Sequence, residues 1–125
     1  MNKKVVLTDG YCHLCYNIGK VLIKKKYKVL LLLRRHNAYT NELVHAGAKF
    51  KIVNFHNITS IKSALKDYNI LINTASNNPY NPKEEILREN TSLAKNIFKS
   101  TVATKVKKII HVSSSIIYER KNNNK

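Results

Sequence analysis

The sequence predicts an α/β fold in which five parallel strands form a doubly wound sheet of order 3-2-1-4-5. Two observations carry this prediction. Short apolar runs alternate along the chain with stretches whose apolar residues recur at helical spacing. The total of 125 residues is the length of one domain, and no internal repeat divides it. Strict alternation of strands and helices builds a parallel sheet that is covered on both faces, and right-handed crossovers favour the doubly wound order.

The first half of the chain predicts strand, helix, strand, helix and strand in turn. Apolar runs of strand length stand at Val5–Leu7, Val29–Leu33 and Phe50–Val53. Between the first two, residues 14 to 22 carry apolar side chains at helical spacing, with lysines largely off that stripe. Residues 41 to 46 predict a short helix that ends at Gly47, because glycine readily adopts the left-handed conformation common at helix ends.

The second half continues the alternation. Apolar residues over 58 to 65 predict a short helix, which Thr59 or Ser60 would cap. The fourth and fifth strands are predicted at Ile70–Ile72 and Lys108–Val112. Between them lies the longest helix, with an apolar face that includes Ile86, Asn90, Leu93, Ala94 and Ile97. We expect residues 1–118 to form the domain and the polar residues 119–125 to be a frayed tail.

The formal charge of +16 first suggests a nucleic-acid partner. Only four of the 23 basic residues are arginines, however, and the lysines are scattered over every segment. This distribution favours a solvated lysine surface, with no specific nucleic-acid site; a basic protein that binds nucleic acid non-specifically is kept as an alternative. No apolar run approaches the roughly 20 residues that cross a bilayer, and the first residues lack a signal-peptide core. We therefore expect a cytoplasmic protein without a membrane partner.

In a doubly wound sheet, ligands bind beyond the carboxyl ends of the strands, where the strand order reverses. In this chain that rule brings several polar segments to one crevice. They are residues 8–15, Arg34, residues 54–57, residues 74–76 and residues 113–115.

These segments, together with residues 90–96 and above all residues 105–115, resemble the short-chain dehydrogenase/reductase superfamily. The extended branch, which contains NAD-dependent epimerases, dehydratases and dihydroflavonol-type reductases, is the most similar. The similarity runs from Lys3 to Tyr118 and implies a Rossmann-type NAD(P)-binding domain.

The resemblance implies a set of cofactor-binding positions and one catalytic position. The cofactor-binding positions are Asp9, Gly10, Cys12, Leu14, Cys15, Arg34, Arg35, Asn57, Ile58, Thr74, Ala75, Ser76 and Asn90. Asn57 stands where the family usually has an aspartate near the adenine, and Ser115 matches the catalytic serine or threonine that hydrogen-bonds the substrate. Arg34 and Arg35 fall where guanidinium groups pair with a ribose 2′-phosphate, which favours NADP over NAD.

The chain departs from the family at the turn after the first strand. The family has three glycines there, because the backbone must turn tightly and approach the pyrophosphate. The matching residues here are Asp9, Cys12 and Cys15, with Gly10 beside the first. We therefore predict weak or absent dinucleotide binding.

The second departure concerns catalysis. The family's Tyr-x-x-x-Lys pair, which carries out proton transfer, has no counterpart beyond Ser115, since Tyr118 is followed four residues later by Asn122. We expect a truncated domain that is inactive alone. It would expose apolar surface, which a partner chain supplying the missing C-terminal half would cover.

The cysteines allow another hypothesis. Residues 9–15 are similar to the Asp-Gly-x-Cys-x-Leu-Cys opening of the small DCC family of thiol-disulfide oxidoreductases. A Cys-x-x-Cys pair at a helix N-terminus has its thiolate stabilised by the helix dipole. The alternative function is therefore redox chemistry at Cys12 and Cys15. We expect no metal site there, because a structural zinc needs a fourth ligand.

Overall fold

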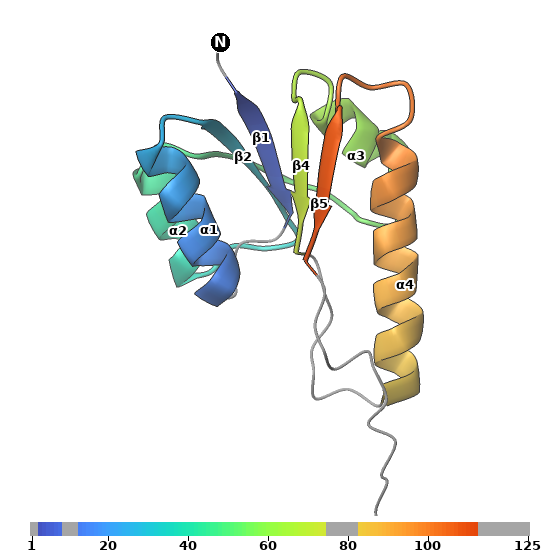
Figure 1. Cartoon of the computed structure of the whole chain (residues 1–125). Coiled ribbons are helices and arrows are strands. Elements are labelled where there is room, and N and C mark those ends of the chain that lie inside the picture. The colour runs from blue at the N-terminus through green and yellow to red at the C-terminus, as the bar shows by residue number, and fades with distance from the viewer. Residues whose placement is uncertain (1–2, 9–12, 75–82, 113–125) are drawn as a thin grey trace, which may run out of the picture.

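The computed structural model describes residues 3–8, 13–74 and 83–112, and for residues 83–87, 89 and 90 it describes the backbone alone. These residues form five strands and four helices in strict alternation (Figure 1). The elements are β1 Lys4–Thr8, α1 His13–Lys24, β2 Lys28–Leu33, α2 Ala38–His45, β3 Lys49–Ile52, α3 Ile58–Ala64, β4 Ile70–Asn73, α4 Lys83–Ser100 and β5 Lys108–His111. The predicted tail, residues 119–125, lies outside the described residues.

The sheet confirms the predicted topology. All neighbouring strands are parallel, and their order is β3-β2-β1-β4-β5. After β3 the chain crosses to the other side of β1, so the strand order reverses between β1 and β4. At this point Leu7 lies beside Ile72 and Thr8 beside Asn73. This pair of strands forms the switch point, and their carboxyl ends define the place where a ligand is expected.

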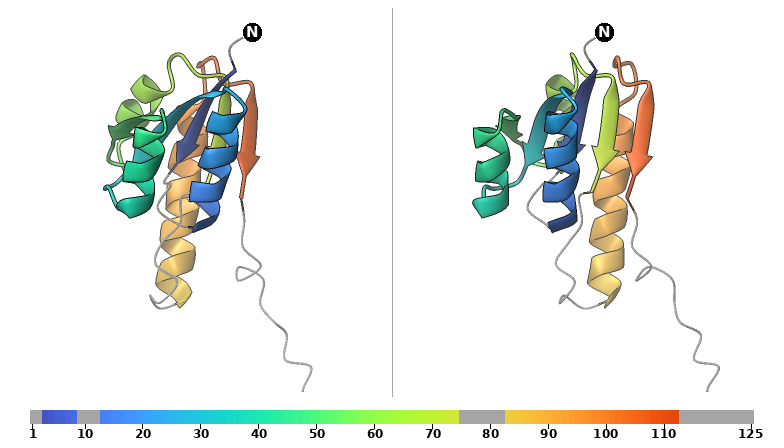
Figure 2. Two further views of the ribbon diagram at one scale, coloured as in Figure 1. Left: turned by 90° about the vertical axis from the view of Figure 1, so that its left-hand side faces the viewer. Right: turned by 60° about the vertical axis from the view of Figure 1, so that its left-hand side comes forward.

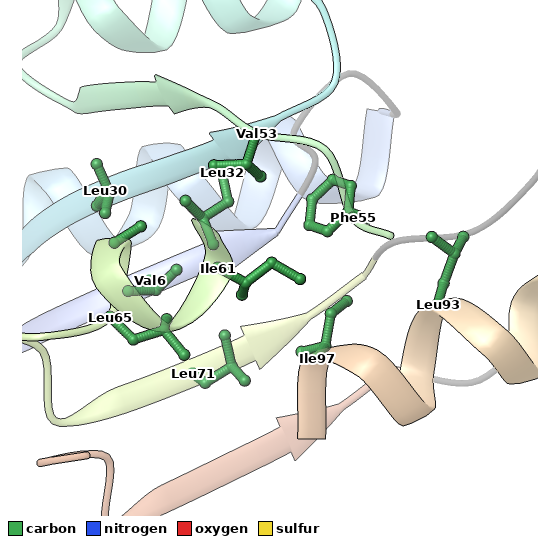
Figure 3. Close-up of a cluster of buried hydrophobic side chains, with 11 residues drawn as sticks. Val6, Leu30, Leu32, Val53, Phe55, Ile61, Leu65, Leu71, Leu93 and Ile97 are labelled. Carbon is green, nitrogen blue, oxygen red and sulfur yellow. The ribbon is translucent and has the colours of Figure 1, made fainter. Parts of the chain in front are cut away.

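Each face of the sheet carries its own core. On one face α3 and α4 cover a cluster centred on Val6, Leu71 and Phe55, which Figure 3 shows in close-up. On the other face α1 and α2 cover a second cluster. It includes Val5 and Leu31, and its strand residues alternate along the chain with those of the first cluster. The two views of Figure 2 show α1 and α2 on one side of the sheet and α4 on the other. Successive strand side chains alternate between the faces, which explains why the central strands are apolar throughout.

The start of α2 and the cap of α3 differ from the sequence-based prediction, because asparagine side chains cap both helices. Asn37 caps α2, its oxygen accepting from the Thr40 backbone 3.0 Å away, so α2 begins at Ala38 and is longer than predicted. Asn57 caps α3 by accepting from the Ser60 backbone at 3.1 Å. The predicted caps Thr59 and Ser60 were wrong, since both lie inside α3. The predicted left-handed conformation after α2 is confirmed, with φ +120° at Gly47.

Candidate functional site

A buried hydrogen-bond network joins the carboxyl ends of the central strands. Thr8 Oγ1 donates to Asn73 Oδ1 at 2.7 Å and accepts from the Thr74 backbone N–H at 3.0 Å. Thr74 Oγ1 donates in turn to the Thr8 carbonyl. Asn73 Nδ2 lies 3.1 Å from His111 Nδ1 at the end of β5. The network fixes the relative positions of β1, β4 and β5 at the point where the strand order reverses.

The first turn of α1 packs against this network. Cys15 is 1% exposed, and its Sγ lies 3.0 Å from Thr74 Oγ1. Its sulfur is disulfide-bonded, and the described residues include no free cysteine. The neighbouring Leu14 is 53% exposed. The N-terminus of α1 therefore lies close to the ends of β1 and β4, where its backbone N–H groups and dipole favour an anion.

Two arginines follow β2 on the far side of the switch point. Arg34 is half-buried, with its guanidinium carbon 5.9 Å from the centre of the Phe55 ring, whereas Arg35 is exposed. The Phe55 ring is itself buried in the core, so it gives the Arg34 side chain a rigid support. Both positions are at the carboxyl edge of the sheet, as the sequence predicted, one strand away from the N-terminus of α1.

The predicted adenine contact, Asn57, is placed beyond β3 with its side-chain oxygen engaged in capping α3. Ile58 begins that helix and is half-buried. These two residues lie on the same carboxyl edge, but the oxygen of Asn57 already accepts a backbone hydrogen bond. In the role predicted for it, Asn57 would have to use its amide nitrogen.

Several predicted site residues cannot be placed. Asn90 lies in α4, but its side chain is not described. Outside the described residues are Asp9, Gly10, Cys12, Ala75, Ser76 and Ser115. The structure thus brings together Cys15, Thr74 and the end of β1, with the arginines on the neighbouring strand.

Thr8 was predicted at this edge within residues 8–15, but its partners Asn73 and His111 were not among the predicted residues. Their common signal is that each is a polar residue at the last position of a strand. Because parallel strands in this order end at one edge, polar residues at these positions meet. The reasoning also missed Gly19: a Cβ there would lie 2.9 Å from both terminal methyl carbons of Leu43, so α1 and α2 meet at this glycine.

A Tyr-x-x-x-Lys spacing does occur elsewhere in the chain, at Tyr16 and Lys20 on α1. The Lys20 ammonium lies 5.1 Å from the centre of the Tyr16 ring, which itself stacks on Tyr39 of α2 at 5.0 Å. A hydrogen bond with Glu42 raises the pKa of Tyr16 above 10.0, with burial and the charge of Glu42 adding to it. A catalytic proton donor needs the opposite shift. The contacts of this pair therefore tie it to the α1–α2 interface.

The same part of the chain shows neither a metal centre nor a membrane span. Within the described ranges, no three His, Cys, Asp or Glu side chains gather closely enough to hold a metal ion. No described helix is long and apolar enough to cross a bilayer.

This chain is similar to one known protein family and to several solved structures. A family model described as NAD(P)H-binding matches residues 17–125. Among solved structures, a UDP-N-acetylglucosamine 4-epimerase from Bacillus cereus is 13% identical over 96% of this chain, with a TM-score of 0.78. Alfalfa vestitone reductase is 27% identical over 90% of the chain, with a TM-score of 0.72. A uronate dehydrogenase mutant from Agrobacterium tumefaciens, complexed with NAD, is 16% identical over 91%, with a TM-score of 0.69.

The chain corresponds to only part of each of these enzymes. It spans 38%, 36% and 42% of their respective lengths. No curated protein matches the chain. What these enzymes share with this chain is therefore the doubly wound domain. At its described carboxyl edge lie the N-terminus of α1, where phosphates are favoured, and the two arginines that follow β2.

Proposed function

The chain belongs to the NAD(P)H-binding family, and from this premise we propose that it binds NADP(H) in preference to NAD(H), with reduced affinity, at the carboxyl edge of β1, β2 and β4. The observation that carries the preference is the position of Arg34 and Arg35 directly after β2. In dinucleotide-binding sheets the residues at this position face the adenine ribose, and a nearby arginine accommodates its 2′-phosphate.

The chemistry of the two arginines supports this assignment. A guanidinium can bind a phosphate through two parallel hydrogen bonds, which a lysine ammonium cannot do. Arg34 rests on the buried Phe55 ring, which limits the conformations that its side chain has to lose on binding. Arg35, being exposed, would supply charge more than fixed geometry.

The reduced affinity follows from the turn between β1 and α1. Where this family places glycines, the chain has Asp9, Cys12 and Cys15. The described member of the three, Cys15, fills the contact between α1 and Thr74, a place where glycine would allow helix and strand to approach more closely. A carboxylate at position 9 would also repel the pyrophosphate at the helix N-terminus.

Titration calorimetry of the purified chain with NADPH and NADH tests the proposal. We expect saturable binding that is tighter for NADPH, and Arg34→Gln should weaken NADPH binding about tenfold while leaving NADH nearly unchanged, the size expected for a lost charge-assisted phosphate contact. Lys28→Gln is the matched control, since it removes the same charge at the opposite end of the same strand. Equal affinity for both cofactors, unaltered by Arg34→Gln, would contradict the NADP preference.

We also propose that the chain alone does not catalyse hydride transfer. Among the described tyrosines, the one with a lysine four residues later is Tyr16, and its raised pKa and its place against α2 disqualify it as a proton donor. The check is the NADPH absorbance of the isolated chain mixed with aldehydes, ketones and UDP-hexoses. A steady, protein-dependent decrease in absorbance would overturn this proposal.

A thiol-disulfide function is the second candidate, because Cys15 is disulfide-bonded in the structure. The only other cysteine of the chain is Cys12, which lies outside the described residues. A redox role requires reversible disulfide formation and a thiol pKa clearly below that of free cysteine. The pH dependence of the alkylation rate of the reduced protein gives the thiol pKa. A rate that keeps rising with pH up to the ordinary pKa of free cysteine would exclude the redox role.

A further inference from the structure

Many lysines that are scattered along the sequence are gathered in space at the amino edge of the sheet, the edge where the strands begin. All neighbouring strands are parallel, so they begin at one edge, and α1 and α4 end there, as Figure 1 shows at the top of the view. The exposed lysines that begin a strand, precede one or end a helix are Lys3, Lys24, Lys25, Lys26, Lys28, Lys49, Lys62, Lys66, Lys99, Lys105, Lys107 and Lys108, with Lys4 half-buried beside them.

The sheet holds three of these lysines in a row. Lys4 of β1 is the register partner of Lys28 of β2, and Lys49 begins β3 on the other side of β2. Lys49 pairs with Leu30, two residues after Lys28, and side chains two residues apart on a strand share a face. Lys4, Lys28 and Lys49 therefore lie on one face of the sheet, on three adjacent strands, at the edge where those strands begin.

The stability of the fold does not explain this row. Lys24 and Lys99 lie in the last turns of α1 and α4, where the helix dipole favours a cation, but a strand start offers no such dipole. Like charges on neighbouring strands repel each other, so Lys4 beside Lys28 destabilises the sheet. An anion bound along the row would relieve this repulsion.

The acidic side chains that the structure describes do little to balance the charge of this edge. Asp67 lies in the turn before β4, whereas Glu42 contacts Tyr16 in the first turn of α1. The amino edge therefore concentrates positive charge at one end of the molecule, and such a surface attracts a polyanion.

The shape of this charged surface suits a linear polyanion. Neighbouring strands are about 4.8 Å apart, so the edge from Lys49 on β3 to Lys108 on β5 is about 19 Å long. A nucleic-acid strand carries one phosphate per about 3.4 Å, so about six phosphates span this edge. The match is to a phosphate backbone, which lysine ammonium groups bind as point charges without reading the bases.

We propose that the amino edge, centred on Lys4, Lys28 and Lys49, is a binding surface for the phosphate backbone of nucleic acids. It lies at the opposite ends of the strands from the carboxyl edge, where the dinucleotide is proposed to bind. Both ligands should therefore bind at the same time. The inference does not depend on dinucleotide binding.

A fluorescein-labelled oligonucleotide of about 12 nucleotides, twice the length that the edge covers, tests the proposal by fluorescence anisotropy with the whole chain. The triple variant Lys4→Gln/Lys28→Gln/Lys49→Gln should weaken binding at least about tenfold at moderate salt. It should also make the slope of log affinity against log salt concentration smaller by about 2, because three phosphate contacts are lost.

The matched control is Lys20→Gln/Lys51→Gln/Lys95→Gln. It removes the same number of charges from exposed lysines inside α1, β3 and α4, and it should change the affinity less than about threefold. Thermal unfolding checks that both triple variants fold. The amino-edge variant should unfold at or above the temperature of the unaltered chain, since it removes a like-charge pair.

Four results would overturn the proposal. The first is no saturable binding of the oligonucleotide at low salt, and the second is equal weakening by the two triple variants, which would assign the binding to total charge. The third is displacement of the oligonucleotide by NADPH at constant ionic strength. The fourth is tighter binding to phosphatidylserine vesicles that Val102→Ser abolishes, because Val102, 66% exposed beyond α4, would then mark a membrane surface.

Discussion

Asn73 is the residue on which the carboxyl edge of the sheet depends. It is fully buried, accepts from Thr8 and lies within hydrogen-bond distance of His111. Three strands therefore end in one polar network, although the middle of each strand is apolar. A buried polar group that loses its hydrogen-bond partner keeps the full free-energy cost of its desolvation. Removing one member of the network therefore leaves an unpaired buried group, whereas removing both partners of a hydrogen bond does not.

We predict that Asn73→Leu lowers the free energy of unfolding by about 1–3 kcal/mol, because it removes the acceptor of the buried Thr8 hydroxyl. Urea denaturation followed by circular dichroism measures the loss. The double variant Thr8→Val/Asn73→Leu removes both partners and should be less destabilised than the sum of the two single variants. Strict additivity would show that the two side chains are not coupled.

Tyr16 gives a pH-dependent contribution to stability. Its pKa is raised above 10.0 by the Glu42 hydrogen bond and then by burial, and burial raises that of Tyr68 in the same direction. A raised pKa in the folded state stabilises the fold below the unfolded pKa, and this contribution disappears as the pH rises through the folded pKa.

We therefore predict that the free energy of unfolding falls above about pH 10, and that Tyr16→Phe removes part of this fall while the part from Tyr68 remains. Glu42→Gln should lower the pKa of Tyr16, because it removes the carboxylate that the hydroxyl contacts. Absorbance at the tyrosinate band follows the titration. An unchanged titration in Glu42→Gln would contradict the assigned cause.

At the scale of elements, α1 is a helix that makes contacts on more than one side. Its first turn packs on the end of β4 through Cys15, and its middle meets α2 at Gly19. A glycine within a helix lowers helical propensity by about 1 kcal/mol relative to alanine. Its presence here is explained by the Leu43 methyl groups, which occupy the space that a side chain would need.

We predict effects of different size for two substitutions at this glycine. Gly19→Ala should change the free energy of unfolding by less than about 1 kcal/mol, because higher helical propensity offsets a small rotation of Leu43. Gly19→Val should destabilise by about 2–3 kcal/mol, since the branched side chain cannot be accommodated by one flexible neighbour. Thermal unfolding of both variants measures the difference, and equal stability of the two would show that α1 and α2 can move apart freely.

At the scale of the whole molecule, two features stand out: the charge and the uncovered sheet. The formal charge of +16 is distributed over all segments, while apolar residues at both sheet edges remain exposed, such as Phe50 on β3 and Ile109 on β5. Net charge keeps such a molecule soluble, and it also attracts polyanions without selecting among them.

We predict that the chain binds single- and double-stranded nucleic acids of unrelated sequence with similar affinity, and that this affinity falls steeply with salt. Filter binding or anisotropy at several salt concentrations checks this. A preference for one sequence or structure that persists at high salt would instead support a dedicated nucleic-acid function.

The sequence by itself determined the architecture. Short apolar runs separated by helical periodicities specify a parallel sheet, and the handedness of crossovers restricts its order, so β3-β2-β1-β4-β5 could be predicted without coordinates. The positions of Arg34, Thr74 and Cys15 at the carboxyl edge followed from the same rule. The helix caps were not predicted from the sequence. The caps at Asn37 and Asn57 depend on which of several adjacent polar residues takes the extended conformation.

Only the tertiary structure decided which residues meet. The link from Thr8 through Asn73 to His111 joins residues far apart in the chain, and periodicity gives no information about their separation in space. The role of Gly19 and the structural use of Tyr16 and Lys20 were hidden for the same reason. A sequence pattern reports which face of an element is apolar. Whether another element covers that face, as α4 covers one side of β5 and no described helix covers the other, depends on packing in three dimensions.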